Sequence, residues 1–170
     1  MKKPADIAED FRNVMRNYPQ GVAVLASSAD GNLYGMTVSS FISVSMNPPL
    51  LLVSIMKGNH IHDVFAKCDR FSLTILAYDQ SELSERFSKF QELERRFDGV
   101  DYTLEERGLP ILDDSVAGII CERWKNVEAG DHTLLIGRVV YAKILNEKLP
   151  LVYFRREYTT VKQKELADKK

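Results

Sequence analysis

Residues 22–45 read VAVLASSADGNLYGMTVSSFISVS, two apolar segments with a turn between them. Residues 22–26 are a short apolar run. The dipeptide Asp30-Gly31 that follows is a strong hairpin signal, because both residue types readily adopt the left-handed backbone of a tight turn. Residues 33–45 are then rich in β-branched, hydroxyl and aromatic side chains, a composition typical of strands. This stretch therefore predicts two antiparallel strands joined by a tight turn.

The rest of the chain contains more strand-like than helix-like segments. Further strands are predicted at residues 50–56, 71–76, 116–123, 133–145 and 151–154. Apolar residues at helical spacing predict helices over residues 7–18, around residues 61–65 and after Asp79, which resembles a capping box together with Glu82. The strands do not alternate with helices as in a parallel sheet. We therefore expect a mainly β fold, an antiparallel β-barrel with flanking helices on its outside.

The composition argues against several classes of protein. The 170 residues carry 23 Lys+Arg and 24 Asp+Glu, a formal net charge of −1, so no overall field attracts nucleic acid or an anionic membrane. This length suits one domain, which we expect at residues 1–160, before a charged C-terminal tail at residues 161–170. No apolar run approaches the roughly 20 residues that cross a bilayer. We expect neither nucleic acid nor a membrane as a partner.

The cysteines and histidines indicate neither a disulfide framework nor a metal site. Cys68 and Cys121 lie far apart with no CxxC pair, so both are expected to be small packed residues. His60 and His62 are two residues apart, which is not the spacing of one helical face, and His132 is remote in sequence. The N-terminus has no apolar segment of the kind that forms a secretory signal. These features favour a cytoplasmic protein.

Hydroxyl groups are dense in residues 35–41, GMTVSSF. Thr37 and Ser39 point to one face of a strand and Ser40 to the other. Hydroxyls and free backbone amides at a strand end supply hydrogen-bond donors without bulk, which suits contact with a phosphate or a heterocycle. The same pattern also fits the solvent face of an edge strand.

Two further segments combine polar groups with a turn. In residues 54–61, SIMKGNHI, a buried strand leads into a helix whose start would face an anion. In residues 129–133, AGDHT, Asp131 lies next to His132 and can influence its imidazole. Each segment also fits an ordinary joint between elements. No GxGxxG or Walker-type phosphate loop and no GxSxG nucleophile motif accompanies them.

Arginines lie beside aromatic residues in two places, residues 94–97 (ERRF) and residues 154–158 (FRREY). Basic groups next to aromatic rings can hold a dinucleotide by charge and stacking. Solvated ends of a helix or strand explain either stretch equally well.

Taken in chain order, these segments resemble the flavin reductase family, whose members have the FMN-binding split-barrel fold. The closest subgroup resembles the reductase components of two-component flavin-dependent monooxygenases, such as 4-hydroxyphenylacetate 3-monooxygenase. The resemblance covers about residues 8–160 and is carried by FRNVMR (11–16), PQGVAV (19–24), GMTVSSF (35–41), SMNPPL (45–50), GDH (130–132) and PLVYFRREY (150–158).

The resemblance implies roles for particular residues. The wall of the flavin site would comprise Met36, Thr37, Val38, Ser39, Ser40, Ser54, Ile55 and Lys57. His132 would be the catalytic residue on the nicotinamide side and would also contact the flavin. Tyr158 would approach from the C-terminal segment, and Phe87 and Ser88 would also come close. Where relatives carry small hydroxyl residues this chain has Asn59 and His60, which can still donate hydrogen bonds to a phosphate.

The same resemblance implies an NAD(P)H:flavin oxidoreductase. NADH or NADPH would reduce FMN or FAD by hydride transfer, and the reduced flavin would pass to a separate oxygenase of the aromatic hydroxylase type. The sequence leaves both cofactor choices open. The chain would form a homodimer, as relatives do.

Other functions fit the same fold. One is a flavin-binding electron carrier or a ferric reductase. Another is a non-enzymatic module that binds flavin or haem, although such a module has no need of the residues Gly130-Asp131-His132.

Overall fold

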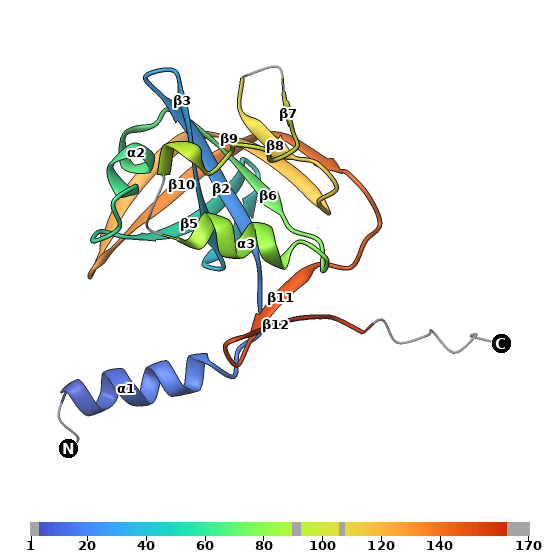
Figure 1. Ribbon diagram of the computed structural model, residues 1–170. Helices are drawn as coiled ribbons and strands as arrows, with labels where there is room; N and C mark the ends of the chain where they lie inside the picture. Colours follow the sequence, from blue (N-terminus) through green and yellow to red (C-terminus); the bar gives the residue numbers. More distant parts are fainter. Residues whose placement is uncertain (1–3, 90–92, 106–107, 163–170) are drawn as a thin grey trace.

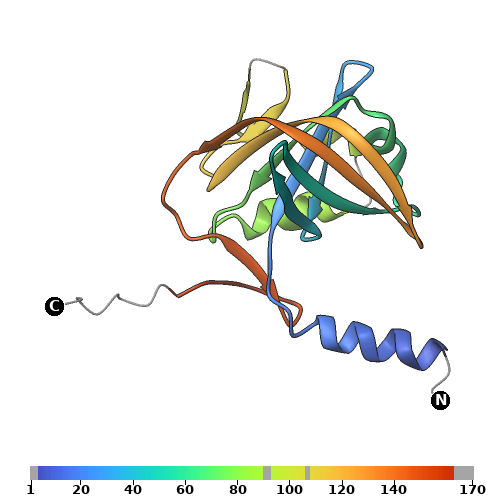
Figure 2. The same ribbon diagram turned by 180° about the vertical axis from the view of Figure 1, so that it is seen from behind.

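Seven antiparallel strands form one strongly curved sheet in the computed structural model, which describes residues 4–89, 93–105 and 108–162 (Figure 1). In sheet order these strands are β3 (Asn32–Val38), β2 (Ala23–Ala29), β6 (Arg70–Ile75), β9 (Ala117–Ala129), β10 (His132–Ile144), β5 (Pro49–Met56) and β4 (Phe41–Met46). All neighbouring strands pair antiparallel. The expected antiparallel barrel is confirmed, and Figure 2 shows its curvature from behind.

The hairpin between β2 and β3 is also confirmed. Asp30 and Gly31 form its turn with φ angles of 51° and 81°, the left-handed region that these residue types tolerate. The expectation of one continuous strand over residues 33–45 is wrong, because the strand breaks at Ser39 and Ser40. β3 and β4 form the two opposite edges of the sheet, so this two-residue link crosses the gap where the barrel stays open. We call the link and the gap the seam.

The barrel interior is filled by alternate positions of its strands. Val53 and Ile55 on β5 and Phe71 on β6 are almost completely buried. Gly137 on β10 lies against this core, and a Cβ atom added there would come within 2.5 Å of Phe71 Cζ and 2.6 Å of Cys121 Cβ. The strand can pack this closely only because position 137 has no side chain.

The two cysteines contribute to packing. Both are free thiols, Cys121 completely buried and Cys68 partly so. Burial raises the pKa of the Cys121 thiol to about 12, and it also raises the pKa of Cys68. Neither thiol is therefore activated as a nucleophile at neutral pH.

Two short helices lie against the barrel, α2 (His62–Lys67) and α3 (Ser81–Ser88). α3 buries Phe87, whose ring meets Phe97 edge-on at 4.9 Å between centroids. The predicted capping box is wrong: Gln80 precedes the helix without a side-chain capping bond, and Asp79 instead accepts a hydrogen bond from Lys148 at 2.9 Å. The following segment contains η1 (Leu93–Arg95), β7 (Tyr102–Leu104) and β8 (Pro110–Leu112).

Helix α1 (Pro4–Met15) stands apart from the barrel, beside a small sheet of β1 (Gln20–Gly21), β11 (Leu151–Phe154) and β12 (Glu157–Thr160) (Figures 1 and 2). Its predicted apolar stripe is exposed to solvent: Ile7, Phe11 and Val14 are 56%, 64% and 67% accessible. We expected the flanking helices to pack on the outside of the barrel. This expectation is therefore wrong for α1. β12 was not predicted, and most of the expected tail, residues 163–170, lies outside the described residues.

In the described part of the chain, no helix combines the length and the apolar character needed to span a membrane.

Replacing Gly137 by alanine should destabilise the fold by roughly 1–3 kcal/mol, because the new methyl group overlaps Phe71 and Cys121 in a packed core. Urea unfolding of the purified protein measures the effect. Gly58→Ala is the matched control, since a Cβ there meets nothing within 4 Å. Equal stability of the two variants would contradict the close packing at position 137.

Candidate functional site

The seam between β3 and β4 borders a cavity of about 520 Å³, which we call the seam cavity. Its walls combine three serine hydroxyls and an amide with aromatic and aliphatic groups: Ser39, Ser40, Ser54, Gln20, Tyr18, Phe41, Ile42 and Leu52. The volume lies within the roughly 300–1,000 Å³ of small-molecule sites, and the mixed walls are typical of them. The structure thus brings together three of the predicted site residues, all of them serines.

Reciprocal hydrogen bonds hold the seam to β5. Ser40 Oγ donates to the carbonyl oxygen of Ser54 at 2.7 Å, and the backbone N–H of Ser54 donates to the carbonyl of Ser40 at 2.8 Å. Ser39 Oγ donates to Gln20 Oε1 at 3.2 Å. Among the described residues, none accepts a hydrogen bond from the Gln20 amide nitrogen, which leaves its two donors available to a ligand.

The strand register extends this wall toward His132. On β5 the residues 51, 53 and 55 face the core, so Leu52, Ser54 and Met56 face outward. β10 pairs His132 with Met56 and Leu134 with Ser54, and directly paired residues share a face of the sheet. A half-exposed surface of serine, aliphatic and imidazole groups therefore runs from the seam cavity to the start of β10.

Lys57 is held at the tip of the β9–β10 hairpin. Its ammonium group donates to the carbonyl of Gly130 at 3.0 Å and pairs with Glu128 Oε2 at 2.5 Å. The hydrogen bond from Lys57 lowers the pKa of Glu128, so this carboxylate is ionised at neutral pH. Thr133 Oγ1 donates to the same carboxylate at 3.2 Å. One N–H of the ammonium remains for a ligand, but its charge is already partly compensated.

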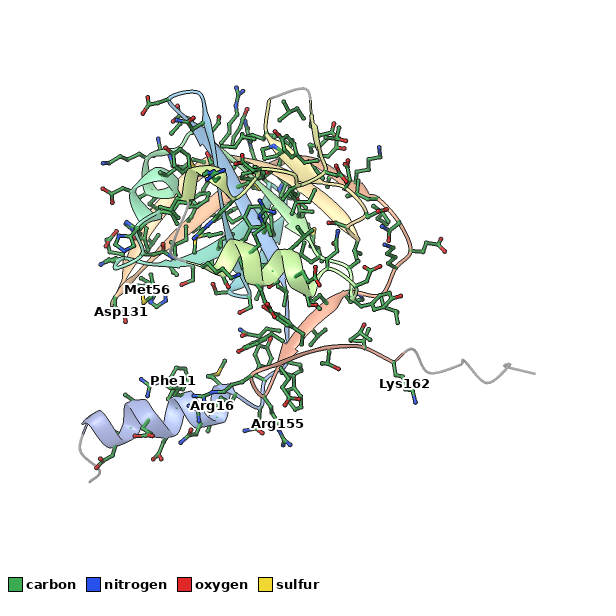
Figure 3. The ribbon with its side chains drawn as sticks, in the orientation of Figure 1. Phe11, Arg16, Met56, Asp131, Arg155 and Lys162 are labelled. Atoms are coloured by element: carbon green, nitrogen blue, oxygen red, sulfur yellow. The ribbon has the colours of Figure 1, made fainter. Side chains whose placement is uncertain are left out.

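His132 and Asp131 form the second polar pair at this tip. His132 Nδ1 lies 2.7 Å from Asp131 Oδ1, and the imidazole is 38% exposed. This contact lowers the pKa of Asp131, because the hydrogen bond from the ring and the ring's charge both favour the carboxylate. With Nδ1–H donating to Asp131, Nε2 has no hydrogen-bond partner among the described residues and can meet a substrate. Figure 3 shows Asp131 beside Met56 at this end of the barrel.

Tyr158 reaches the site region through Ser84. The Tyr158 and Ser84 hydroxyls are 2.8 Å apart, and Thr37 Oγ1 donates to the Ser84 carbonyl at 2.6 Å. The strand β12 is thereby linked to β3 through α3. The predicted residues Thr37 and Tyr158 are connected through Ser84, although neither lines the seam cavity.

Several predicted residues present no side chain to the seam cavity. Val38, Ile55 and Phe87 are at most 4% exposed and belong to the hydrophobic core. Met36 packs against that core, and Ser88 Oγ donates to the carbonyl of Glu85. Contact between a flavin and Val38 or Ile55 would have to use their backbone groups.

The segment after Lys57 is also occupied locally. Asn59 Oδ1 accepts the backbone N–H of Ile61 at 3.1 Å, so this amide orders the turn before α2. His60 is exposed and lies next to it. The sequence predicted that the start of this helix would face an anion. α2 has only six residues, which is short for such a helix.

The sequence-family model described as "Flavin reductase like domain" matches residues 15–162 of this chain. The chain belongs to the flavin reductase family. The match spans every strand described above, including both halves of the seam and the β9–β10 hairpin.

Relatives named for this activity align over most of the chain. An FMN reductase (NADH), SmoA, from Agrobacterium fabrum is 36% identical over 79% of this chain and 76% of its own length. The reductase component of an FADH(2)-dependent resorcinol hydroxylase from a Rhizobium species is 34% identical over 91% of this chain and 88% of its own.

A solved structure shares the fold over nearly the whole chain. The NADH:FAD oxidoreductase SgcE6 of Streptomyces globisporus, in complex with NAD and FAD fragments, superimposes with a TM-score of 0.86. It is 28% identical, and 99% of each chain is covered.

Sequence reasoning missed residues that act through three-dimensional contacts. Glu128 carries no motif, and only the register of the long β9–β10 hairpin brings it to Lys57. Ser84 was hidden in an ordinary helical pattern, although a completely buried serine in a helix signals a hydrogen-bonding role. Gln20 lies in the PQGVAV stretch that carries the resemblance, but the resemblance implied no role for it.

Asp131 should titrate below its ordinary pKa of 3.8, because the folded protein favours its carboxylate. Its contact with His132 then stabilises the fold above pH 3.8 and is lost as the pH falls through the lowered pKa. Carboxyl carbon NMR shifts across an acid titration give the midpoint. In His132→Ala the midpoint should rise toward 3.8, whereas a native midpoint at or above that value would contradict the pairing.

Proposed function

We propose that this chain is an NAD(P)H-dependent flavin reductase that reduces FMN or FAD and supplies the reduced flavin to a partner monooxygenase. The observation that carries the proposal is the seam cavity, whose walls continue along β5 to His132. The proposal is supported by the relatives, whose names include an FMN reductase and the reductase of a resorcinol hydroxylase.

The residues present fit a flavin. Its fused ring is flat and largely apolar on its faces, with polar atoms along one edge. Tyr18, Phe41 and Leu52 offer apolar contact, while the unused N–H groups of Gln20 can donate to a ring carbonyl. The serine oxygens Ser39 Oγ and Ser40 Oγ donate within the protein and can still accept hydrogen bonds.

The protein's contribution to the reaction is binding and orientation. A bound flavin supplies the ring that accepts a hydride from a nicotinamide. The outward faces of β5 and β10 would hold both rings in one geometry and would exclude water from one side. His132, oriented by Asp131, offers Nε2 to the nicotinamide or to the edge of the flavin. Lys57 offers its remaining N–H to a phosphate.

The site is built for exchange of the flavin. The seam cavity is open to solvent, and Glu128 already compensates part of the Lys57 charge. Both features keep flavin affinity moderate, which suits a protein that must release reduced flavin to another enzyme. We place this activity in the reducing cytoplasm, a setting that agrees with two free cysteines.

We propose that the active form is a homodimer. Phe11 and Val14 leave an apolar stripe on α1 without cover, and Ile42, Val44 and Met46 on the edge strand β4 are 60%, 51% and 80% exposed. Apolar rows of this extent are typical of surfaces buried in an assembly. A second copy would cover both surfaces and protect the edge of β4 from unspecific pairing.

Anaerobic stopped-flow mixing tests the reductase proposal. The protein is combined with FMN or FAD and then with NADH or NADPH, and the visible absorbance of the oxidised flavin is followed. We expect rapid bleaching with at least one pairing. Slow or absent bleaching with flavin still bound would favour an electron carrier or a binding module, and faster reduction of ferric complexes than of flavin would favour a ferric reductase. A protein that binds no flavin would refute the proposal.

His132→Ala should lower kcat/KM for the nicotinamide at least about tenfold, because the ring that orients the second substrate is lost. Thermal stability should change little, since the side chain is 38% exposed. Steady-state kinetics with saturating flavin gives the comparison, and Lys125→Ala on the same hairpin is the control. Unchanged kcat and KM in the histidine variant would show that His132 has no role in the mechanism.

Replacing Phe11 and Val14 together by serine should shift the protein from dimer to monomer, because the apolar stripe of α1 is lost. Sedimentation equilibrium reports the mass. Glu9→Ser, on the polar side of the same helix, should leave the dimer intact. A native protein that sediments as a monomer at working concentration would contradict the dimer.

A further inference from the structure

A second cavity, of about 210 Å³, lies between α1 and the β11–β12 hairpin. We call it the arginine pocket, because four arginines line it together with two tyrosines: Arg12, Arg16, Arg155, Arg156, Tyr18 and Tyr153. Figure 3 shows Arg16 at the end of α1 facing Arg155 on the hairpin. Four guanidinium groups around one small space form a strongly positive local site on a chain whose net charge is −1.

Two of these arginines are positioned by neutral groups. Arg16 Nη1 donates to Asn13 Oδ1 at 2.7 Å, and Arg155 Nε donates to Asn17 Oδ1 at 3.1 Å. The ion pairs found among residues 4–89, 93–105 and 108–162 all involve other basic groups. Two of the four side chains are thus oriented by neutral groups, and none of the four forms an ion pair with a carboxylate among the described residues.

The backbone of the hairpin turn presents two of the arginines. Arg155 and Arg156 have φ angles of 51° and 70°, a conformation that non-glycine residues rarely adopt. The backbone N–H of Arg155 donates to the carbonyl of Arg16 at 3.1 Å, which ties the turn to the end of α1. A strained turn fixed in this way keeps two guanidinium groups together beside a helix.

The arginine pocket adjoins the seam cavity. Tyr18 and Gln20 line both, so the two cavities share part of a wall. Its volume of about 210 Å³ is below the range of a site that encloses a whole small molecule. It suits one compact, highly charged group of a ligand whose remaining parts lie in the seam cavity or on the surface.

We propose that the arginine pocket binds the pyrophosphate of an adenosine dinucleotide, either FAD or the nicotinamide substrate. This inference rests on the proposed function for the ring half of the ligand. Guanidinium groups bind phosphate oxygens in bidentate fashion, and a pyrophosphate offers enough oxygens for several of them. The rings of Tyr18 and Tyr153, 59% and 38% exposed, offer faces on which an adenine can stack.

The test compares two double variants of the full-length protein. Arg12→Gln with Arg156→Asn removes two charges from the pocket, and asparagine tolerates the left-handed backbone at position 156. Lys125→Gln with Lys143→Gln removes the same charge from exposed positions on β9 and β10. Calorimetric titration gives Kd for FAD, FMN and ADP, and kinetics gives KM for NADH.

We expect the arginine variant to bind ADP and FAD at least about tenfold more weakly, with a clearly smaller loss for FMN, because FMN carries only one of the two phosphates. That result assigns the pocket to FAD. Weaker ADP binding and a raised KM for NADH, with both flavins unaffected, assigns it to the nicotinamide dinucleotide. Both results support binding of the shared pyrophosphate.

Two results would overturn the proposal. One is an equal loss of FMN and FAD affinity, which implicates the single phosphate common to both flavins. The other is an arginine variant that behaves like the lysine variant for every ligand. The proposed function is judged separately, by flavin bleaching in the native protein. A protein that fails to bleach, yet loses ADP binding in the arginine variant, retains the pocket and refutes the reductase.

Discussion

The attachment of the seam to β5 is the constraint on which the site depends. A curved sheet of seven strands leaves β3 and β4 as unpaired edges, and a link of only two residues joins them. Reciprocal bonds between Ser40 and Ser54 hold that link against β5. An open barrel edge would ordinarily expose unpaired backbone groups. Here the gap becomes a cavity, and the polar groups beside it become candidate ligand contacts.

The long β9–β10 hairpin supplies the other half of the site. Its register places His132 opposite Met56 and brings Glu128 to Lys57. The flavin contacts proposed on β5 and the nicotinamide contacts proposed on β10 therefore belong to one continuous antiparallel pairing. Close packing at Gly137 fixes this hairpin against the core. The packing of the barrel therefore determines the geometry of the site.

Local sequence signals predicted much of the barrel. The Asp30-Gly31 turn and the apolar run of β5 are determined by neighbouring residues, and both were placed correctly. The break at Ser39 was not, because strand propensity continues across it and only closure of the sheet forces the chain to leave one edge for the other. The predicted capping box failed because Asp79 pairs with the distant Lys148.

The site was predicted less completely than the fold, for a related reason. Resemblance to a family identifies positions in the chain, whereas burial decides which group at a position a ligand can reach. Val38 and Ile55 were predicted for the flavin wall, but the alternation of each strand turns their side chains into the core. The periodicity of α1 likewise identified its apolar face without showing what covers it.

Pairing between the two ends of the chain has a consequence for synthesis. β1, at residues 20–21, pairs with β11, at residues 152–153, whereas the curved sheet is complete once β10 ends at Ile144. A nascent chain can therefore form its barrel on the ribosome before the platform of β1, β11 and β12 exists. The arginine pocket needs that platform, so it is assembled last, and a chain truncated before Leu151 would lack this pocket.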